Sequence, residues 1–308
     1  MITVAERLKL LRRLAVICAL MVFAVTSLSA YLRLSKAGLG CADWPQCYGQ
    51  SLRQLQQGVA VSADEQTTTA AARLAHRTVA VLALLLVLLM VAVCFTAQPV
   101  LRSQGVMALV LLGLALFLAV LGRWSSSARV PAVTMGNLVG GFAMLALCIR
   151  LAVAGLPAHA ARLGAWVAAA GIVLLVQLAF GGLVSASFAG LSCSGWADCA
   201  QAVRGVGWDV LDPWREPVLS ATPPINPSGA LAHLIHRGLG LLLAALVLPL
   251  AVVAWRRGRP RSAIALLGLL GAQLAVGMVM TQTTLPFALA LLHNLLAAGL
   301  LAAFMLLT

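Results

Sequence analysis

Acidic residues are scarce in this chain of 308 residues, which contains eight Asp and Glu against 21 Lys and Arg. Charged residues make up only 9% of the sequence, whereas soluble domains carry about 25%. None of the acids falls within the long apolar runs. This scarcity argues against a water-soluble fold. It also argues against a transporter, because such proteins relay ions through carboxylates inside the membrane.

Nucleotide-binding and hydrolase motifs are also missing. The sequence contains no phosphate-binding P-loop, no dinucleotide fingerprint in its strand context, and no nucleophile elbow of the serine hydrolases. The net charge of +13 does not indicate a nucleic-acid partner. The basic residues lie mostly at the ends of apolar runs, where they face lipid headgroups and set the topology.

Apolar residues, by contrast, are abundant at 62% of the chain. A helix needs about 20 of them in succession to cross the hydrocarbon core of a bilayer. The first run is interpreted as such a helix, because no clean cleavage site of a signal peptide follows it. The sequence therefore predicts an all-α integral membrane protein with eight spans, at residues 14–34, 72–95, 105–123, 132–153, 162–187, 229–255, 262–282 and 285–307.

An internal repeat organises these spans. Residues 37–47 (AGLGCADWPQC) match residues 189–199 (AGLSCSGWADC) at six of eleven positions. Further on, LAHR at 74–77 matches LIHR at 234–237, and GNL at 136–138 resembles HNL at 293–295. Because the matches occur in the same order, we predict a parallel duplication of a four-helix unit, with halves at residues 1–155 and 156–308.

The basic residues set the predicted orientation. Total Lys and Arg counts on the two sides are nearly equal, but the cluster at 256–261 and the basic N-terminus favour cytoplasmic termini. The long loops at 35–71 and 188–228 then face outward. In the inner (plasma) membrane of a bacterium, that side is the oxidising periplasm.

Cysteines fall into two groups. Three lie in apolar runs, where a thiol is usually a small core hydrophobe: Cys18, Cys94 and Cys148. Four form two pairs in the outward loops: Cys41 with Cys47, and Cys193 with Cys199. In the periplasm each pair can form a disulfide, either as a structural staple or as a redox-active group. The spacing differs from the C-x-x-C redox motif and therefore favours the staple, with the redox-active group as the alternative.

Three of the five histidines are candidates for function. His76, His236 and His293 lie near the outward ends of their spans, where ionisable groups are costly. His236 and His293 are both roughly 10–12 Å deep on parallel helices, and can therefore face each other. Two imidazoles suit a heme iron, whereas zinc would need further ligands. The other two are expected to be interfacial (His233) and solvated in an inner loop (His159).

Polar residues beside these histidines complete the candidate set. Arg77 and Arg237 each follow a histidine at the membrane edge, where a guanidinium can pair with a heme propionate or reach lipid phosphate. Gln177 and Gln273 share a Q-L-A-x-G pattern in two spans. Helix packing is the expected role of this pattern, with a cofactor contact as the alternative.

Taken together, these motifs resemble one family. Residues 32–49 (LRLSKAGLGCADWPQCYG) are similar to the signature loop of the heme A synthase family. The His-Arg pairs, the AGL before the second cysteine pair, and LALLH at 289–293 match as well. The resemblance covers nearly the whole chain.

The resemblance implies eight helices in two pseudo-symmetric bundles and oxidation of a methyl group of heme O to a formyl group, which yields heme A for cytochrome oxidase. The second half would hold heme b between His236 and His293. The first half would receive heme O, with His76 as an iron ligand. A disulfide between Cys41 and Cys47 is also implied. Expected partners are heme O synthase, other oxidase assembly proteins and the lipid membrane, with a homo-oligomer as an open alternative.

Two positions in the first half depart from the family. Arg73 stands where the family has a glutamate. Gly136 or Asn137 stands where it has a histidine, and the neighbouring Met135 is only a weak potential ligand. These changes leave a non-catalytic heme-binding assembly factor as an alternative to an enzyme. A b-type electron carrier is a further alternative, which rests on the pair His236 and His293.

Overall fold

A computed structural model describes residues 3–59, 69–124, 129–156 and 164–307. Within these ranges eight helices are long and apolar enough to cross a membrane, which confirms the all-α multi-pass fold. They are α1 (Val4–Lys36), α4 (Ala70–Phe95), α5 (Arg102–Trp124), α6 (Pro131–Ala152), α7 (Gly164–Ala186), α9 (Ala230–Arg256), α10 (Pro260–Gln282) and α11 (Phe287–Leu307).

Local sequence explains several helix ends. Pro131 and Pro260 begin α6 and α10 at the position where a missing N–H costs nothing. The helix that contains the first predicted span, at 14–34, is longer than that span, because α1 begins at Val4. There the Thr3 and Glu6 side chains form a capping box, so the helix starts in the basic segment before the apolar run. His159 lies outside the described residues.

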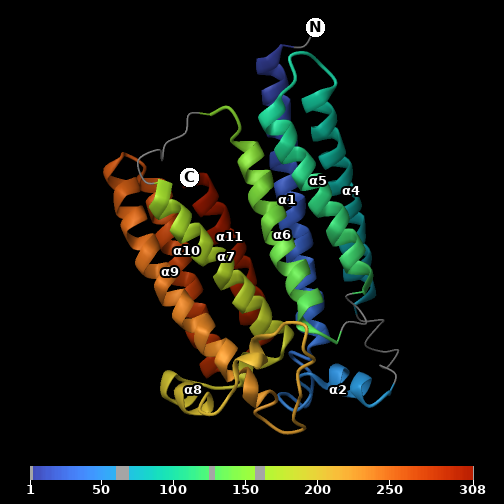
Figure 1. Cartoon of the computed structure of the whole chain (residues 1–308), viewed down its shortest axis with the longest axis vertical. Coiled ribbons are helices and arrows are strands. Elements are labelled where there is room, and N and C mark those ends of the chain that lie inside the picture. The colour runs from blue at the N-terminus through green and yellow to red at the C-terminus, as the bar shows by residue number, and fades with distance from the viewer. Residues whose placement is uncertain (1–2, 60–68, 125–128, 157–163, 308) are drawn as a thin grey trace.

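The eight helices form two neighbouring groups (Figure 1). In the first, α1 packs against α4 and α6, and α5 contacts both of these helices. In the second, α9 packs against α7 and α10, and α10 packs against α11. The groups meet where α6 contacts α7 and α11, and where α1 contacts α11. This grouping agrees with the sequence repeat, while the boundary near residue 155 and the symmetry stay predictions.

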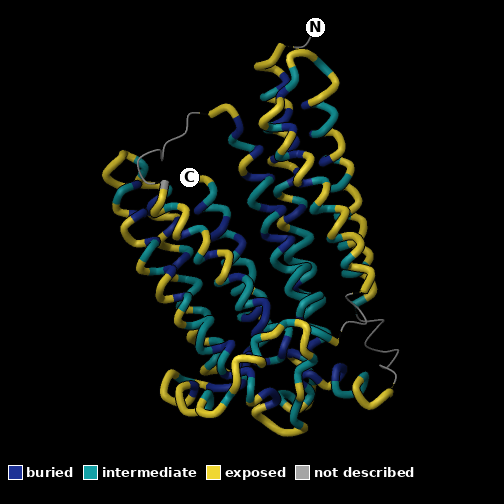
Figure 2. The backbone as a smooth tube through the Cα atoms, viewed as in Figure 1, coloured by how far each residue is buried: buried dark blue, intermediate teal, exposed yellow. Residues whose placement is uncertain are grey.

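Buried side chains follow the inner faces of both groups (Figure 2). One continuous apolar core includes Leu11, Met90, Leu151 and Leu266, each fully buried. Exposed leucines and valines lie on the outer faces of the helices. Such faces suit lipid, which is as apolar as leucine.

Both long loops lie at one end of the bundle, away from the start of α1 (Figure 1). They contain α2 (Gln50–Gln56), α8 (Trp196–Ala202) and three 3₁₀ turns, η2 (Ala189–Leu191), η3 (Trp208–Leu211) and η4 (Pro227–Gly229). We call this the loop end. Which compartment it faces stays a prediction.

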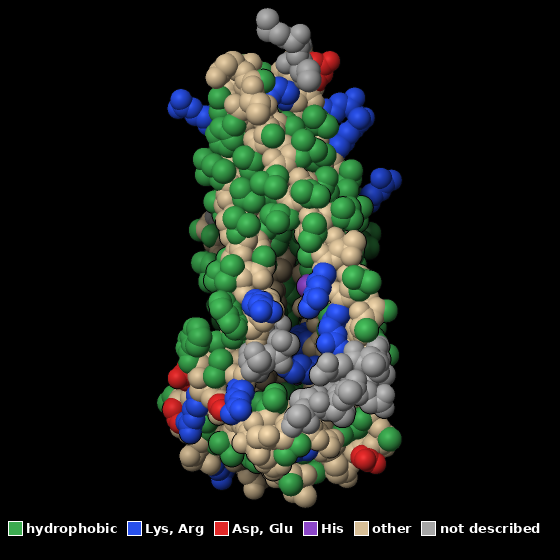
Figure 3. Space-filling model, turned by 90° about the vertical axis from the view of Figure 1, so that its right-hand side faces the viewer, with side chains coloured by type: hydrophobic (Ala, Val, Ile, Leu, Met, Phe, Trp, Pro, Cys, Tyr) green, Lys and Arg blue, Asp and Glu red, His purple; other side chains and the backbone are tan. Residues whose placement is uncertain are grey.

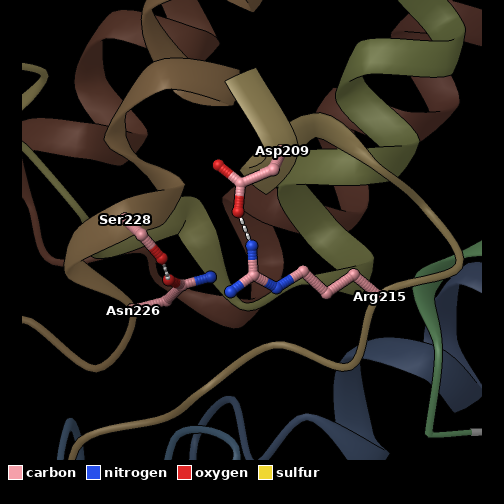
Figure 4. Close-up of polar contacts among 4 residues, drawn as sticks. All are labelled: Asp209, Arg215, Asn226 and Ser228. Atoms are coloured by element: carbon pink, nitrogen blue, oxygen red, sulfur yellow. Dashed lines mark hydrogen bonds and ion pairs between the residues drawn. The ribbon is translucent and has the colours of Figure 1, made fainter. Parts of the chain in front are cut away.

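Asn226 ties the second loop to the helices beneath it. Its buried side chain donates from Nδ2 to the Ser187 carbonyl at 2.6 Å and accepts from the Ser228 hydroxyl at 2.9 Å (Figure 4). In the same loop Asp209 pairs with Arg215 (Figure 4). Because Ser187 directly follows α7 and Ser228 lies just before α9, these bonds hold together the ends of the two helices that flank the candidate site.

Candidate functional site

His236 on α9 and His293 on α11 lie together inside the second group of helices. Their ring centroids are 6.4 Å apart, and the ring planes are inclined at 70°. Both rings line one cavity whose walls come from α7, α9, α10 and α11 and, in the first group, from α1 and α6. The structure therefore brings together the two histidines that equal depth on parallel helices predicts to face each other.

A glycine of a Q-L-A-x-G segment lies against each histidine ring. A Cβ atom added to Gly181 on α7 would come within 2.9 Å of His236 Cε1. The corresponding distance from Gly277 on α10 to His293 Cε1 is 3.1 Å. The repeated motif thus gives each imidazole a neighbour without a side chain, a role that its sequence did not reveal.

The glutamines of the same motif reach the site as well. Gln273 Nε2 lies 3.0 Å from His293 Nε2, within hydrogen-bond distance. Gln177 lines the cavity, and its Nε2 lies 3.3 Å from the position that a Cβ on Gly240 of α9 would occupy. Both glutamines therefore belong to the site, which favours the cofactor contact over packing alone.

Several polar atoms in this cavity are buried without a hydrogen-bond partner. They are Nδ1 of His233, His236 and His293, and Oε1 of Gln177 and Gln273. An unsatisfied buried polar group costs about 1–3 kcal/mol. Such a concentration in one cavity indicates a place prepared for a polar or metal-containing ligand.

The donor set fits a heme iron. Two imidazoles on opposite sides of one metal ion have ring centroids about 6 Å apart, since each metal–nitrogen bond is about 2 Å long. Within the described ranges no three His, Cys, Asp or Glu side chains gather into a metal site. A metal between these histidines would therefore take its other ligands from a cofactor, as a porphyrin provides.

The cavity is narrow, at roughly 130 Å³. Leucine and glycine are frequent in its lining, with Leu174, Leu243 and Leu270 among the leucines. A flat macrocycle between the rings requires these apolar side chains to move apart.

The first cysteine loop covers this cavity from the other half of the chain. Leu39 and Tyr48 from this loop line the cavity, and Trp44 Nε1 donates to the Thr284 carbonyl between α10 and α11 at 2.8 Å. Burial raises the pKa of the Tyr48 phenol. The loop of the first half is thus packed onto the candidate site of the second.

Both cysteine pairs are joined in the structure, Cys41 to Cys47 and Cys193 to Cys199. Arg237 donates to the carbonyl of Cys193 at 3.2 Å and lies 3.3 Å from Cys199 Sγ. Its guanidinium therefore binds the second disulfide loop. Arg237 is not among the described residues that line the cavity.

The first half presents a more open arrangement. His76 on α4 is partly exposed and Arg77 is exposed. On this face Lys and Arg side chains gather around a hollow in which a histidine is visible (Figure 3). Arg73 donates to the Thr69 hydroxyl at 2.7 Å. The structure does not bring His76 to the pair on α9 and α11.

Gly136 on α6 is one of the two positions that can correspond to the histidine of the resembled family. A Cβ on Gly136 would come within 2.8 Å of Leu121 on α5. A histidine at this position would therefore require Leu121 to move. Met135 packs against the apolar cluster at the end of α7.

Sequence reasoning missed two lining residues. His233 was expected at the interface, but it is 4% exposed and lines the cavity. Arg33 of α1 lines the same cavity from the first half. The sequence held a signal only for His233, which precedes His236 by one helical turn. No sequence pattern indicates that Arg33 lies at the cavity. Its position there follows from the packing of α1 against α11.

Comparison with known proteins agrees with these observations. The sequence pattern of a family described as cytochrome oxidase assembly protein matches residues 12–305. A heme A synthase from Shewanella oneidensis is 29% identical over 306 residues, which cover 90% of this chain and 89% of that protein. The resemblance seen in the loop motifs is thus confirmed along nearly the whole chain.

Proposed function

Because this chain belongs to the cytochrome oxidase assembly protein family, we propose that it oxidises a methyl group of heme O to a formyl group and so produces heme A. The pair of facing histidines beneath the signature loop carries the heme-binding part of the proposal. The oxidation itself rests on the similarity along nearly the whole chain. The name of its Shewanella relative, heme A synthase, supports the same reaction.

His236 and His293 are the residues that would hold heme b in the second half. Bound between these two imidazoles, heme b would supply one-electron transfer. The glycines at 181 and 277 leave room for the imidazole edges. Gln273 Nε2 lies 3.0 Å from His293 Nε2, so His293 would bind iron either through its unpaired Nδ1 or after this contact is broken. The leucines of the lining, among them Leu174 and Leu243, surround the histidine pair with apolar surface.

The first half is the proposed place for heme O. His76 is partly exposed on α4 and would ligate the substrate iron there. Arg77 next to it offers a cation for a substrate carboxylate.

We place the protein in the bacterial inner membrane with cytoplasmic termini, so that the loop end lies in the periplasm. Its proposed partners are heme O synthase and other oxidase assembly proteins.

A second candidate is a non-catalytic heme-binding assembly factor. Arg73 in place of the family glutamate, and Gly136 packed under Leu121, favour it. Loss of the glutamate removes an acid–base group near the substrate. This alternative keeps the heme b site and abandons the oxidation.

The two candidates differ in the hemes that the protein yields. The full chain is co-expressed with a heme O synthase in a host that lacks heme A, and the hemes are extracted and separated. The enzyme proposal predicts heme A in these extracts and its loss in His76→Ala. Heme b with heme O but no heme A, from well-folded protein, would support the assembly factor instead.

A separate set of variants tests the assignment of heme b to the second half. We expect His236→Ala and His293→Ala to lose the absorption spectrum of a heme with two axial histidines, whereas His76→Ala retains it. A wild-type protein without this spectrum would contradict the assignment of heme b to the second half.

A further inference from the structure

Arg33 holds an unusual place for a charged side chain. It belongs to the last turns of α1 in the first half, yet it lines the cavity that contains His236 and His293. Within the described lining it is the one Lys, Arg, Asp or Glu residue. The charge therefore enters the candidate site from a helix outside the second group.

Its partner in the structure is neutral. Arg33 Nη2 donates to Asn294 Oδ1 at 2.7 Å, and Asn294 Nδ2 in turn donates to the Ala290 carbonyl at 2.7 Å. The second bond fixes the amide so that its oxygen faces the guanidinium. Asn294 directly follows His293, so the cation is held beside a proposed axial ligand.

The charge itself remains without an anion among the described residues. The Asp and Glu carboxylates there belong to the start of α1 or to the loops, and none forms an ion pair with Arg33. Arg33 is half-buried, and a cation partly withdrawn from water loses solvation free energy unless an anion compensates it. A guanidinium has five N–H donors, of which the amide oxygen accepts one.

We infer that Arg33 is the anion-binding residue of this cavity, and that it receives a carboxylate of the ligand held by His236 and His293. The inference rests on the proposed heme site and identifies the cation that binds a propionate there. Arg237 bonds the second disulfide loop instead, and Arg77 is exposed on the first half. The first half therefore contributes to cofactor binding in the second.

The test compares two probes that differ only in their carboxylates. The purified full chain in detergent is titrated with hemin and with hemin dimethyl ester, and binding is followed by absorption. Wild type is expected to prefer hemin by about tenfold or more, the ratio that 1.4 kcal/mol produces. Arg33→Met removes this preference, and Arg33→Lys recovers part of it. Arg204→Met, which removes an exposed cation of the second loop, retains it.

A pair of variants at Asn294 gives an independent measurement. Asn294→Asp places a carboxylate on the guanidinium and competes with the ligand, whereas Asn294→Ala frees it. We expect Asn294→Asp to weaken hemin binding more than Asn294→Ala, with no such difference for the ester. This pair decides the question if Arg33→Met does not fold.

The outcomes separate the inference from the proposed function. Arg33→Met with the hemin preference of wild type, or equal effects of the two Asn294 variants, would overturn the role of Arg33 alone. Loss of the preference in Arg237→Met instead would move the role to that residue. Absence of a spectrum with two axial histidines in wild type, with either probe, would overturn the heme site and the inference together.

Discussion

Replacement of Gly181 by alanine tests the proposed arrangement of α7 and α9 most directly. The new Cβ would lie 2.9 Å from His236 Cε1 and 3.5 Å from Nδ1. Carbon atoms in contact prefer about 3.5–4.0 Å. The imidazole must therefore shift by several tenths of an ångström or turn away, because the backbones of both helices are held by their packing. Such overpacking costs about 1–3 kcal/mol.

Gly182→Ala is the matched control. It lies on the same helix, gains the same helix propensity, and its Cβ would meet Leu138 at an ordinary 3.4 Å. We expect Gly181→Ala to bind hemin about 5- to 150-fold more weakly than Gly182→Ala, the range that 1–3 kcal/mol spans. Its spectrum should show weakened ligation by His236.

Titration with hemin, followed by absorption and by the midpoint potential of the bound heme, measures this difference. Gly277→Ala should have a smaller effect, because its Cβ would approach His293 Cε1 only to 3.1 Å. Equal affinities and spectra for Gly181→Ala and Gly182→Ala would refute the role that we assign to the Q-L-A-x-G glycines.

Two further predictions concern parts of the fold outside the site. Arg7 is 3% exposed and donates to the carbonyls of Val93, Cys94 and Pro99 at the end of α4. Arg7→Met should therefore cost about 3 kcal/mol in thermal unfolding in detergent, and a melting temperature equal to that of Arg13→Met would contradict this. Asp198 accepts from the Ser194 N–H and hydroxyl, and these bonds lower its pKa. Their contribution to the loop is complete above about pH 4 and is lost as pH falls through the folded pKa. Proteolysis of the loop should rise over that acidic range in wild type, and a pH-independent rate would disprove the linkage.

The sequence predicted the helices well because each carries its own signal. A span needs only an apolar length and a boundary residue, as Pro131 and Pro260 illustrate. At the start of α1, a capping box extends the helix beyond the predicted span into a basic segment. Apolar length cannot detect that extension, because hydrogen bonds rather than lipid stabilise it.

Equal depth on parallel helices also sufficed to predict that His236 faces His293. The roles of the residues around these two histidines were harder to predict from the sequence. The Q-L-A-x-G pattern was visible, but its contact with the imidazoles depends on how α7 packs against α9 and α10 against α11. Likewise, Arg237 follows a histidine in sequence, but its side chain turns to the disulfide loop.

The sequence by itself therefore determined the membrane fold, the family and the pair of histidines, because these depend on composition, motifs and spacing along one helix. Only the tertiary structure decided that Arg33 and the first cysteine loop serve the cavity of the other half. Such contacts join residues more than 200 positions apart, as Arg33 and Asn294 are. Their proximity depends on how α1 packs against α11, which no local pattern encodes.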